Sequence, residues 1–169
     1  MTRIALLLPL ALLVAASRLE AQRPAPTIVS DSVEVIRVVQ RYIDALMAKD
    51  TASLRAASLP SATTVAIALL PGPPPTTGPA RAQTVDEVVA ATGRGTRRFT
   101  GRVWAIEVSV TGPVAIYRAP YDAWYDGVFG HCGVDHYILA RSDGAWRVSQ
   151  LLYTRQTEGC APSPLGPPR

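Results

Sequence analysis

The sequence lacks the short motifs that mark the common catalytic and phosphate-binding sites. It contains no GxSxG nucleophile turn, no HExxH zinc motif and no glycine-rich phosphate-binding loop. Its 169 residues include only two histidines and two cysteines, and the cysteines lack a CxxC spacing, which leaves too few converging ligands for a zinc site. We therefore predict no metal and no other cofactor, and function has to be argued from the fold.

Lysine is nearly absent, because Lys49 is the only one among the 17 basic residues. The formal net charge is +4, but the arginines are scattered along the chain and form no basic stripe. A nucleic-acid interface would concentrate them on one face. We attribute the excess of arginine to coding bias and predict no nucleic-acid partner.

A long apolar run occurs only once, at residues 4–16, after Arg3 and before a polar stretch that ends in Leu19-Glu20-Ala21. This is the pattern of a secretory signal peptide, and the run is short for a membrane span. We predict a signal peptide over residues 1–21 and an exported bacterial protein, periplasmic or secreted, with no membrane contact after cleavage. An uncleaved membrane anchor is the alternative.

Export predicts a structural role for the two cysteines. In an oxidising compartment Cys132 and Cys160 have only each other as intramolecular partners, so we predict a disulfide. It would close a loop of about 28 residues, stabilise the fold by ~3–4 kcal/mol and hold the C-terminal tail against a strand. A nucleophilic Cys132 activated by His131 is the alternative, although adjacent strand residues point to opposite faces.

Three segments place apolar residues at helical spacing after a polar lead-in at residues 22–30. The first can begin at Ser30 or Asp31, both of which are good N-caps. The third can begin at Thr84, which is followed by acidic residues in the first turn. We expect helices over residues 30–50, 50–58 and 84–92.

The remaining segments have the composition of strands and turns. Five prolines between Pro71 and Pro79 predict an irregular surface loop over residues 70–83. After residue 100, turn signals recur at hairpin spacing, which predicts an antiparallel meander, and Pro120 predicts an edge or a bulge that curls the sheet. The expected strands are residues 63–69, 101–110, 114–125, 128–141 and 145–155.

Helices followed by antiparallel strands predict an α+β fold, with the helices gathered on one face of a bent sheet. A curved sheet wrapped on N-terminal helices forms a cone with an internal cavity. We expect one such domain over residues 31–160 and a disordered tail over residues 161–169.

This order of elements, with "VIRVVQRYIDALMAKDTASL" in front and "GAWRVSQLLYT" behind, resembles the nuclear-transport-factor-like, or SnoaL-like, superfamily of cystatin-like cones. Within it, the chain resembles an exported bacterial branch with a strand like "FGHCGVDHYILAR" and an ending like "YTRQTEGC". The resemblance covers residues 31–160. It implies a concave interior that holds ligands in binding modules, or acid–base residues in isomerases, dehydratases and cyclases. The isomerase and dehydratase motifs are not recognisable here, so no catalytic residue carries over.

The strand at residues 128–141 carries the candidate site. Alternation divides it into two faces, of which one holds His131, Gly133, Asp135, Tyr137 and Leu139. We assign this face to the cavity, because Tyr137 and Leu139 suit a core under the helices and Gly133 leaves room there. The outward face is then Cys132, Val134, His136, Ile138 and Ala140.

His131 and Asp135 lie about 13 Å apart along one strand, so they cannot pair with each other. We predict that both bind a ligand, with partners from other elements. A carboxylate in an apolar cone has a raised pKa, and a histidine titrates near neutrality, so both are also candidate catalytic residues. Alternatively, Asp135 only accepts hydrogen bonds that hold the sheet. The further ligand-binding candidates are Tyr42, Trp104, Tyr121, Asp122 and Trp124.

Three functions are compatible with this interpretation. The first is an exported domain that binds a small apolar or aromatic molecule in its cone. The second is an acid–base enzyme of the isomerase, dehydratase or hydrolase type, with Asp135 or Asp122 as base and His131 or a tyrosine as acid. The third is a homodimeric interaction module built on the outer face of the sheet.

Overall fold

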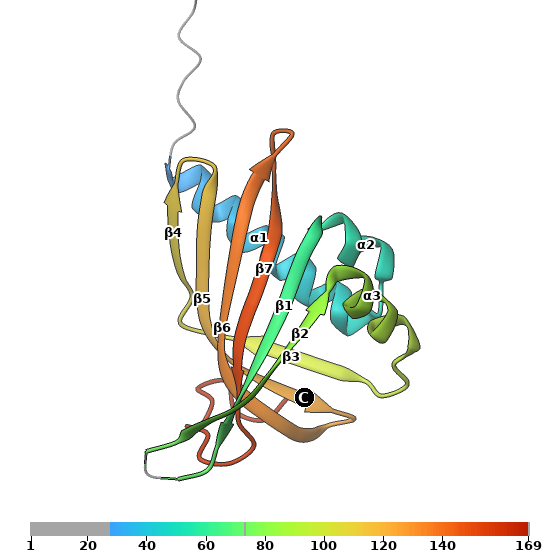
Figure 1. The fold of residues 1–169 in the computed structure, drawn as a ribbon. Coiled ribbons are helices and arrows are strands. Elements are labelled where there is room, and N and C mark those ends of the chain that lie inside the picture. Colours follow the sequence, from blue (N-terminus) through green and yellow to red (C-terminus); the bar gives the residue numbers. More distant parts are fainter. Residues whose placement is uncertain (1–27, 73, 169) are drawn as a thin grey trace, which may run out of the picture.

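The computed structural model describes residues 28–72 and 74–168 (Figure 1). The predicted signal peptide and the lead-in up to residue 27 lie outside these residues. Within them, no helix combines the length and the apolar character that crossing a membrane requires.

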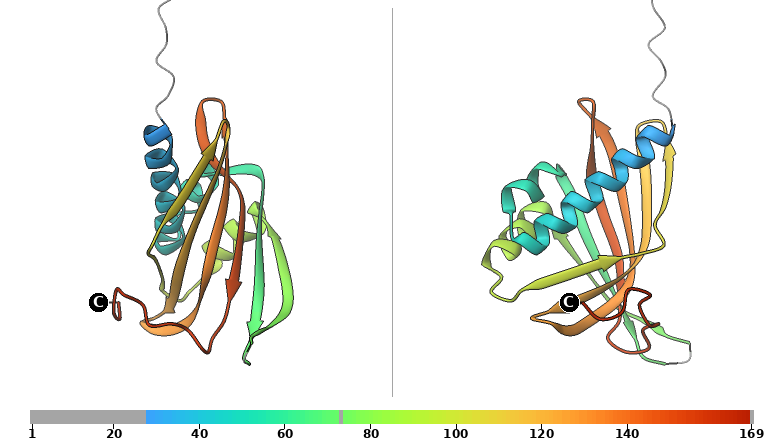
Figure 2. Two further views of the ribbon diagram at one scale, coloured as in Figure 1. Left: turned by 90° about the vertical axis from the view of Figure 1, so that its left-hand side faces the viewer. Right: turned by 180° about the vertical axis from the view of Figure 1, so that it is seen from behind.

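Among the described residues, three helices precede or interrupt the sheet: α1 (Ile28–Ala48), α2 (Thr51–Ala56) and α3 (Val85–Arg94). The predicted helices are present, but α1 extends back to Ile28, past the predicted caps. Asp31 is therefore inside the first turn of α1, where its carboxylate pairs with Arg141 of a strand. Figure 2 shows that α1 lies across the concave face of the sheet.

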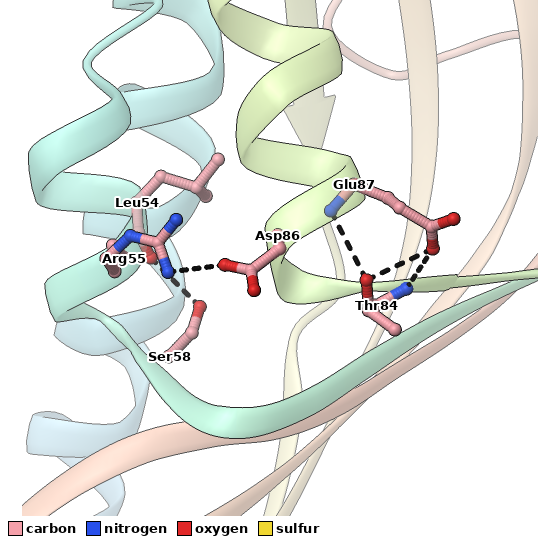
Figure 3. Close-up of polar contacts among 6 residues, drawn as sticks. All are labelled: Leu54, Arg55, Ser58, Thr84, Asp86 and Glu87. Atoms are coloured by element: carbon pink, nitrogen blue, oxygen red, sulfur yellow. Dashed lines mark hydrogen bonds and ion pairs between the residues drawn. The ribbon is translucent and has the colours of Figure 1, made fainter.

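Local capping explains where the two short helices begin. The Asp50 carboxylate accepts a hydrogen bond from the Ser53 N–H (2.9 Å) at the start of α2. Thr84 caps α3 as predicted, and the Glu87 carboxylate accepts a hydrogen bond from the Thr84 N–H (2.7 Å), which completes a capping box (Figure 3). An ion pair between Arg55 and Asp86 (2.6 Å) links α2 to α3.

The strands form a curved, unclosed sheet with the order β2-β1-β7-β6-β5-β3, and β4 also pairs with β5. The α+β fold class is therefore confirmed. The predicted meander is present as β4-β5-β6-β7, but β1 joins β7 in parallel, so the sheet is mixed rather than antiparallel throughout. The strands are β1 (Ser58–Leu70), β2 (Thr76–Thr84), β3 (Phe99–Val103), β4 (Glu107–Thr111), β5 (Val114–Tyr125), β6 (Val128–Ser142) and β7 (Ala145–Arg155).

The predicted loop over residues 70–83 is wrong, because residues 76–84 form β2 in a hairpin with β1. Most of the prolines lie in the connection between the two strands. Pro79 is inside β2, but β2 is an edge strand, and the register with β1 shifts between Ile67 and Leu69. An edge strand with a bulge is where a residue without an N–H is tolerated.

The single strand predicted over residues 101–110 is broken in two. Ala105 has a left-handed backbone (φ 46°) between β3 and β4, and both of these strands pair with β5. Pro120 of β5 faces the gap between them, where no ladder bond needs its missing N–H. The predicted bulge at Pro120 is wrong: the register shift between β5 and β6 lies between Ala123 and Trp124.

The core lies between α1 and the concave face of the sheet, where valines of α1 pack on Tyr117, Tyr137, Leu139 and Trp146. The predicted disulfide between Cys132 and Cys160 is present and ties the segment after β7 to β6. Residues 161–168 contain a turn but no helix or strand, and their disorder stays a prediction.

Candidate functional site

A cavity of about 890 Å³ opens between the concave face of the sheet and helices α1 and α3. Its volume is in the range of small-molecule sites, about 300–1,000 Å³. Four of the predicted binding residues line it: Tyr42 of α1, Tyr121 of β5, and His131 and Asp135 of β6. The face of β6 that we assigned to the interior is therefore the one that meets the cavity.

Asp135 is the one acidic side chain in the cavity wall that the structure describes. It pairs across the sheet with Ala119 of β5 and Tyr153 of β7, and it is only 8 % exposed. Burial raises the pKa of the Asp135 carboxyl to about 8, and no hydrogen bond from a described residue offsets that cause. At neutral pH Asp135 is therefore mostly a neutral acid, which can donate as well as accept a hydrogen bond.

Tyrosines surround Asp135. The ring of Tyr137 meets the rings of Tyr42 and Tyr117 edge-on, each with centroids 5.6 Å apart, and Tyr121 meets Tyr153 in the same way at 6.0 Å. Burial raises the pKa of each of these hydroxyls, so they remain protonated donors. The wall near Asp135 is thus aromatic, neutral and able to donate hydrogen bonds.

Gly133 has a different role from the predicted one. A Cβ atom at Gly133 would lie 1.9 Å from the carbonyl oxygen of Thr154, so only glycine lets that oxygen approach. The same oxygen accepts a hydrogen bond from the Tyr121 hydroxyl at 2.9 Å. The space beside Gly133 is therefore filled by the backbone of β7. The Thr154 carbonyl oxygen there positions the Tyr121 hydroxyl.

His131 forms an aromatic wall with two neighbours. It stacks on Tyr125 (6.0 Å, 30°) and meets Tyr121 edge-on (5.7 Å, 81°). Burial, and then the positive charge of Arg155, lower the pKa of His131 to about 4, so its ring is neutral at neutral pH. Its buried Nδ1 has no hydrogen-bond partner among the described residues.

Three of the predicted binding residues do not line the cavity. Strand alternation puts Asp122 and Trp124 on the face opposite Tyr121. There Asp122 is buried in a two-bond ion pair with Arg102 (2.9 and 2.5 Å). The Arg102 guanidinium lies 5.6 Å from the ring centre of Trp124. Trp104 lies in the break between β3 and β4, so all three assignments are corrected.

Sequence reasoning missed other residues of the site. Tyr153 and Arg155 of β7 face the cavity, and their alternation with Leu151 could have indicated this. Arg81 also faces the cavity, but it lies on β2, which the proline content had hidden. In the part of the chain that the structure describes, no group of three or more His, Cys, Asp or Glu side chains could hold a metal.

The fold recurs in solved structures. A "putative dehydratase from the NTF2-like family" of Streptomyces avermitilis matches at 17% identity with a TM-score of 0.58, covering 78% of this chain and 99% of its own. A "putative scytalone dehydratase" of Novosphingobium aromaticivorans matches at 13% identity and 0.57, covering 77% and 87%. A Nostoc punctiforme protein with a cystatin-like fold matches at 10% and 0.59, covering 76% and 92%.

These identities are low, so the matches show the fold alone, and that fold is the NTF2-like, cystatin-like one that the sequence predicted. A comparison with curated proteins finds no match. A family model does match, over residues 30–154, and its description is "Putative lumazine-binding". Because that match spans most of the 169 residues, the chain belongs to the family described as "Putative lumazine-binding".

Proposed function

We propose that this protein is an exported domain that binds a small aromatic or apolar molecule in its cavity. The observation that carries the proposal is the cavity of about 890 Å³, whose deep wall combines tyrosine rings, a neutral histidine and a mostly protonated Asp135. A largely apolar concave site with a few convergent polar groups is the usual form of a small-molecule pocket.

The family description adds a ligand class to this proposal. Lumazine is a flat two-ring heterocycle with several hydrogen-bonding atoms. Flat rings stack on aromatic side chains, here His131 and Tyr125, whose rings stack on each other at an angle of 30°. The Asp135 carboxyl and the Tyr42 hydroxyl could bond polar ring atoms. We therefore take lumazine as the first ligand to test.

Export is part of the same proposal. It is supported by the signal-peptide pattern of residues 1–21 and by the disulfide between Cys132 and Cys160, since disulfides persist in oxidising compartments. Mass spectrometry of the protein recovered from the bacterial periplasm would show whether residues 1–21 are removed. A protein that keeps them and stays in the cytoplasm would contradict export.

Native mass spectrometry of the mature protein tests the binding proposal. Wild type would be compared with Asp135→Asn and His131→Ala, and with Asp86→Asn as a control outside the cavity, on the surface between α2 and α3. We expect a co-purifying or added aromatic molecule, lumazine first, in wild type and control and a loss of it in the two cavity variants. Equal occupancy in all four proteins would contradict binding in this cavity.

The second candidate function is acid–base catalysis in the same cavity. It is favoured by the position of Asp135, a buried carboxyl with a pKa of about 8 that faces the cavity among hydroxyl donors. An enzyme of this kind would exchange a carbon-bound proton of its ligand with solvent. Incubation of the bound molecule in D2O, followed by NMR, would show deuterium at carbon with wild type and none with Asp135→Asn. No incorporation with wild type would exclude proton abstraction from carbon.

The homodimer on the outer face of the sheet stays a prediction. Val114 and Ile116 of β5 are exposed there (44 % and 48 %), and Cys132 of the same face is occupied by the disulfide. The native mass spectrum also measures the mass of the assembly, so the same experiment tests this prediction.

A further inference from the structure

The charged side chains around the cavity are almost all basic. The structure describes six basic residues in its wall against one acid, Asp135. Two of the six are neutralised, since Arg102 pairs with Asp122 and Arg97 pairs with Asp126 (3.0 Å). The other four have no ion-pair partner among the described residues, and they are Lys49, Arg81, Arg94 and Arg155.

These four cations come from separate elements that converge on one opening. Lys49 directly follows α1 and has a left-handed backbone (φ 56°), and Arg94 is the last residue of α3. Arg81 lies on β2 and Arg155 ends β7. Three of them are exposed and Lys49 is half-buried, so the cations mark the rim of the cavity rather than its deep end.

Strand register places one of these cations in line with Asp135. Asp135 pairs with Tyr153, Tyr153 pairs with Ala66 of β1, and Ala66 pairs with Arg81. The four residues form one row across the inner face of the sheet. Three strand spacings separate its ends, which is about 14 Å. Arg155 lies two residues beyond Tyr153 on β7, beside Ala68 of β1.

The middle of this row has small side chains. The residues of β1 that face the cavity are Thr64, Ala66 and Ala68. They leave space between the tyrosines on one side and Arg81 on the other. The Arg81 side chain can extend back over β1 toward Asp135. The part of the row that remains between its guanidinium and Asp135 suits a molecule of about two fused rings.

The influence of these arginines on the pKa values of cavity residues supports the same arrangement. The charge of Arg155 lowers the pKa of His131, and Arg155 and Arg81 both act to lower the pKa of Tyr153, against a larger rise from burial. Arg81 also acts on Glu87, and the carboxylate of Glu87 is already bound by the cap of α3 (2.7 Å to the Thr84 N–H). The field in the cavity is therefore positive at the rim and neutral near Asp135.

We propose that the ligand is an aromatic carboxylate whose anionic group binds Arg81 and Arg155 at the rim, while its rings lie over β1 and its far end points to Asp135. This rests on the proposed small-molecule function and adds the charge and the orientation of the ligand. Lumazine has no carboxylate, so it tests only the aromatic part of the site. Arginine suits the role because its planar group binds a carboxylate through two parallel hydrogen bonds.

Isothermal titration calorimetry with matched probes tests this. The probes are 2-naphthoate, its neutral carboxamide and 2-naphthyl phosphate. We expect 2-naphthoate to bind at least about tenfold more tightly than the carboxamide, which is the effect of one good ion pair. The double variant Arg81→Gln, Arg155→Gln should remove this preference, so that the naphthoate and the carboxamide bind with similar affinity. Added salt should weaken binding of the naphthoate and leave binding of the neutral carboxamide unchanged.

The control variant is Arg147→Gln, which changes an arginine of the same β7 strand that does not line the cavity. Circular dichroism of each variant would show that the fold is retained. Equal affinity for naphthoate and carboxamide would overturn the proposal that the ligand is anionic, while the proposal of an aromatic site would still hold. Tighter binding of the phosphate than of the naphthoate would overturn the carboxylate. Binding of none of the three would overturn the aromatic site itself, and the anionic ligand with it.

Discussion

Replacing Asp135 with asparagine should reverse the way stability changes with pH. The carboxyl has a pKa of about 8 in the folded protein and about 3.9 in an unfolded chain. Below pH 3.9 the group is protonated in both states, so ionisation costs nothing. As the pH rises toward 8, the unfolded chain releases the proton while the folded protein holds it, so wild type loses stability across that window.

The difference of about four pH units between the two pKa values corresponds to ~5 kcal/mol at ~1.4 kcal/mol per unit. Water that enters the open cavity solvates the ionised carboxylate, so we expect ~2–5 kcal/mol in practice. Asparagine has nearly the same shape as the protonated acid and cannot ionise. The variant should therefore become more stable than wild type by this amount between about pH 4 and pH 8.

His131 contributes with the opposite sign. Its folded pKa of about 4 lies below the unfolded value of about 6.5, so its contribution to stability is lost as the pH falls from 6.5 to 4. This contribution is present in wild type and in Asp135→Asn alike. It cancels when the two unfolding free energies are subtracted, and the subtraction isolates Asp135.

Urea unfolding followed by circular dichroism, without ligand, at about pH 4, 6 and 8, gives the required free energies. The exposed Asp86→Asn serves as the control, and its difference from wild type should change by less than ~1 kcal/mol over the same range. A difference between wild type and Asp135→Asn that stays constant from pH 4 to 8 would refute the buried, neutral carboxyl.

Three further changes test the fold around the cavity, each by urea unfolding. Replacing Cys132 and Cys160 together with alanine should lower the unfolding free energy by ~3 kcal/mol, and a reducing agent should then have no further effect. Gly133→Ala should lower the free energy of unfolding by ~3 kcal/mol or abolish folding, because the new methyl group would overlap the Thr154 carbonyl oxygen. A decrease below ~1 kcal/mol would contradict that contact. Asp122→Asn removes one charge of a buried ion pair and should lower the free energy of unfolding by ~3 kcal/mol. The affinity of the folded variant for 2-naphthoate should nevertheless stay within about twofold of the wild-type value. A larger loss of affinity would show that Asp122 contributes to ligand binding after all.

Much of the local structure follows from the sequence, because it depends on residues close together in the chain. Thr84 and Glu87 are three residues apart, and that spacing alone is enough for the capping box of α3. The strands on either side of the Asp126-Gly127 turn pair because a hairpin needs only a short connection. The disulfide also follows, since two cysteines allow one intramolecular pairing.

The inward face of β6 could be chosen from alternation and side-chain size, which correctly placed His131 and Asp135 toward the interior. Asp122 was misplaced because its neighbour Tyr121 was a candidate as well, and alternation allows only one of them inside. The register at Pro120 is regular, so Tyr121 faces the cavity and Asp122 meets Arg102 on the other face.

Only the tertiary structure decided where the basic rim lies. Arg81 lies in line with Asp135 across the sheet through a parallel pairing of β1 with β7, two strands that are far apart in the sequence. No local pattern encodes that pairing, because its hydrogen bonds join backbone groups whatever side chains they carry. The local sequence even disfavoured β2, whose Pro79 is tolerated because the strand lies at the edge of the sheet. The sequence by itself thus determined the helices, the hairpins from β4 to β7 and the disulfide, and long-range strand register determined which side chains meet in the cavity.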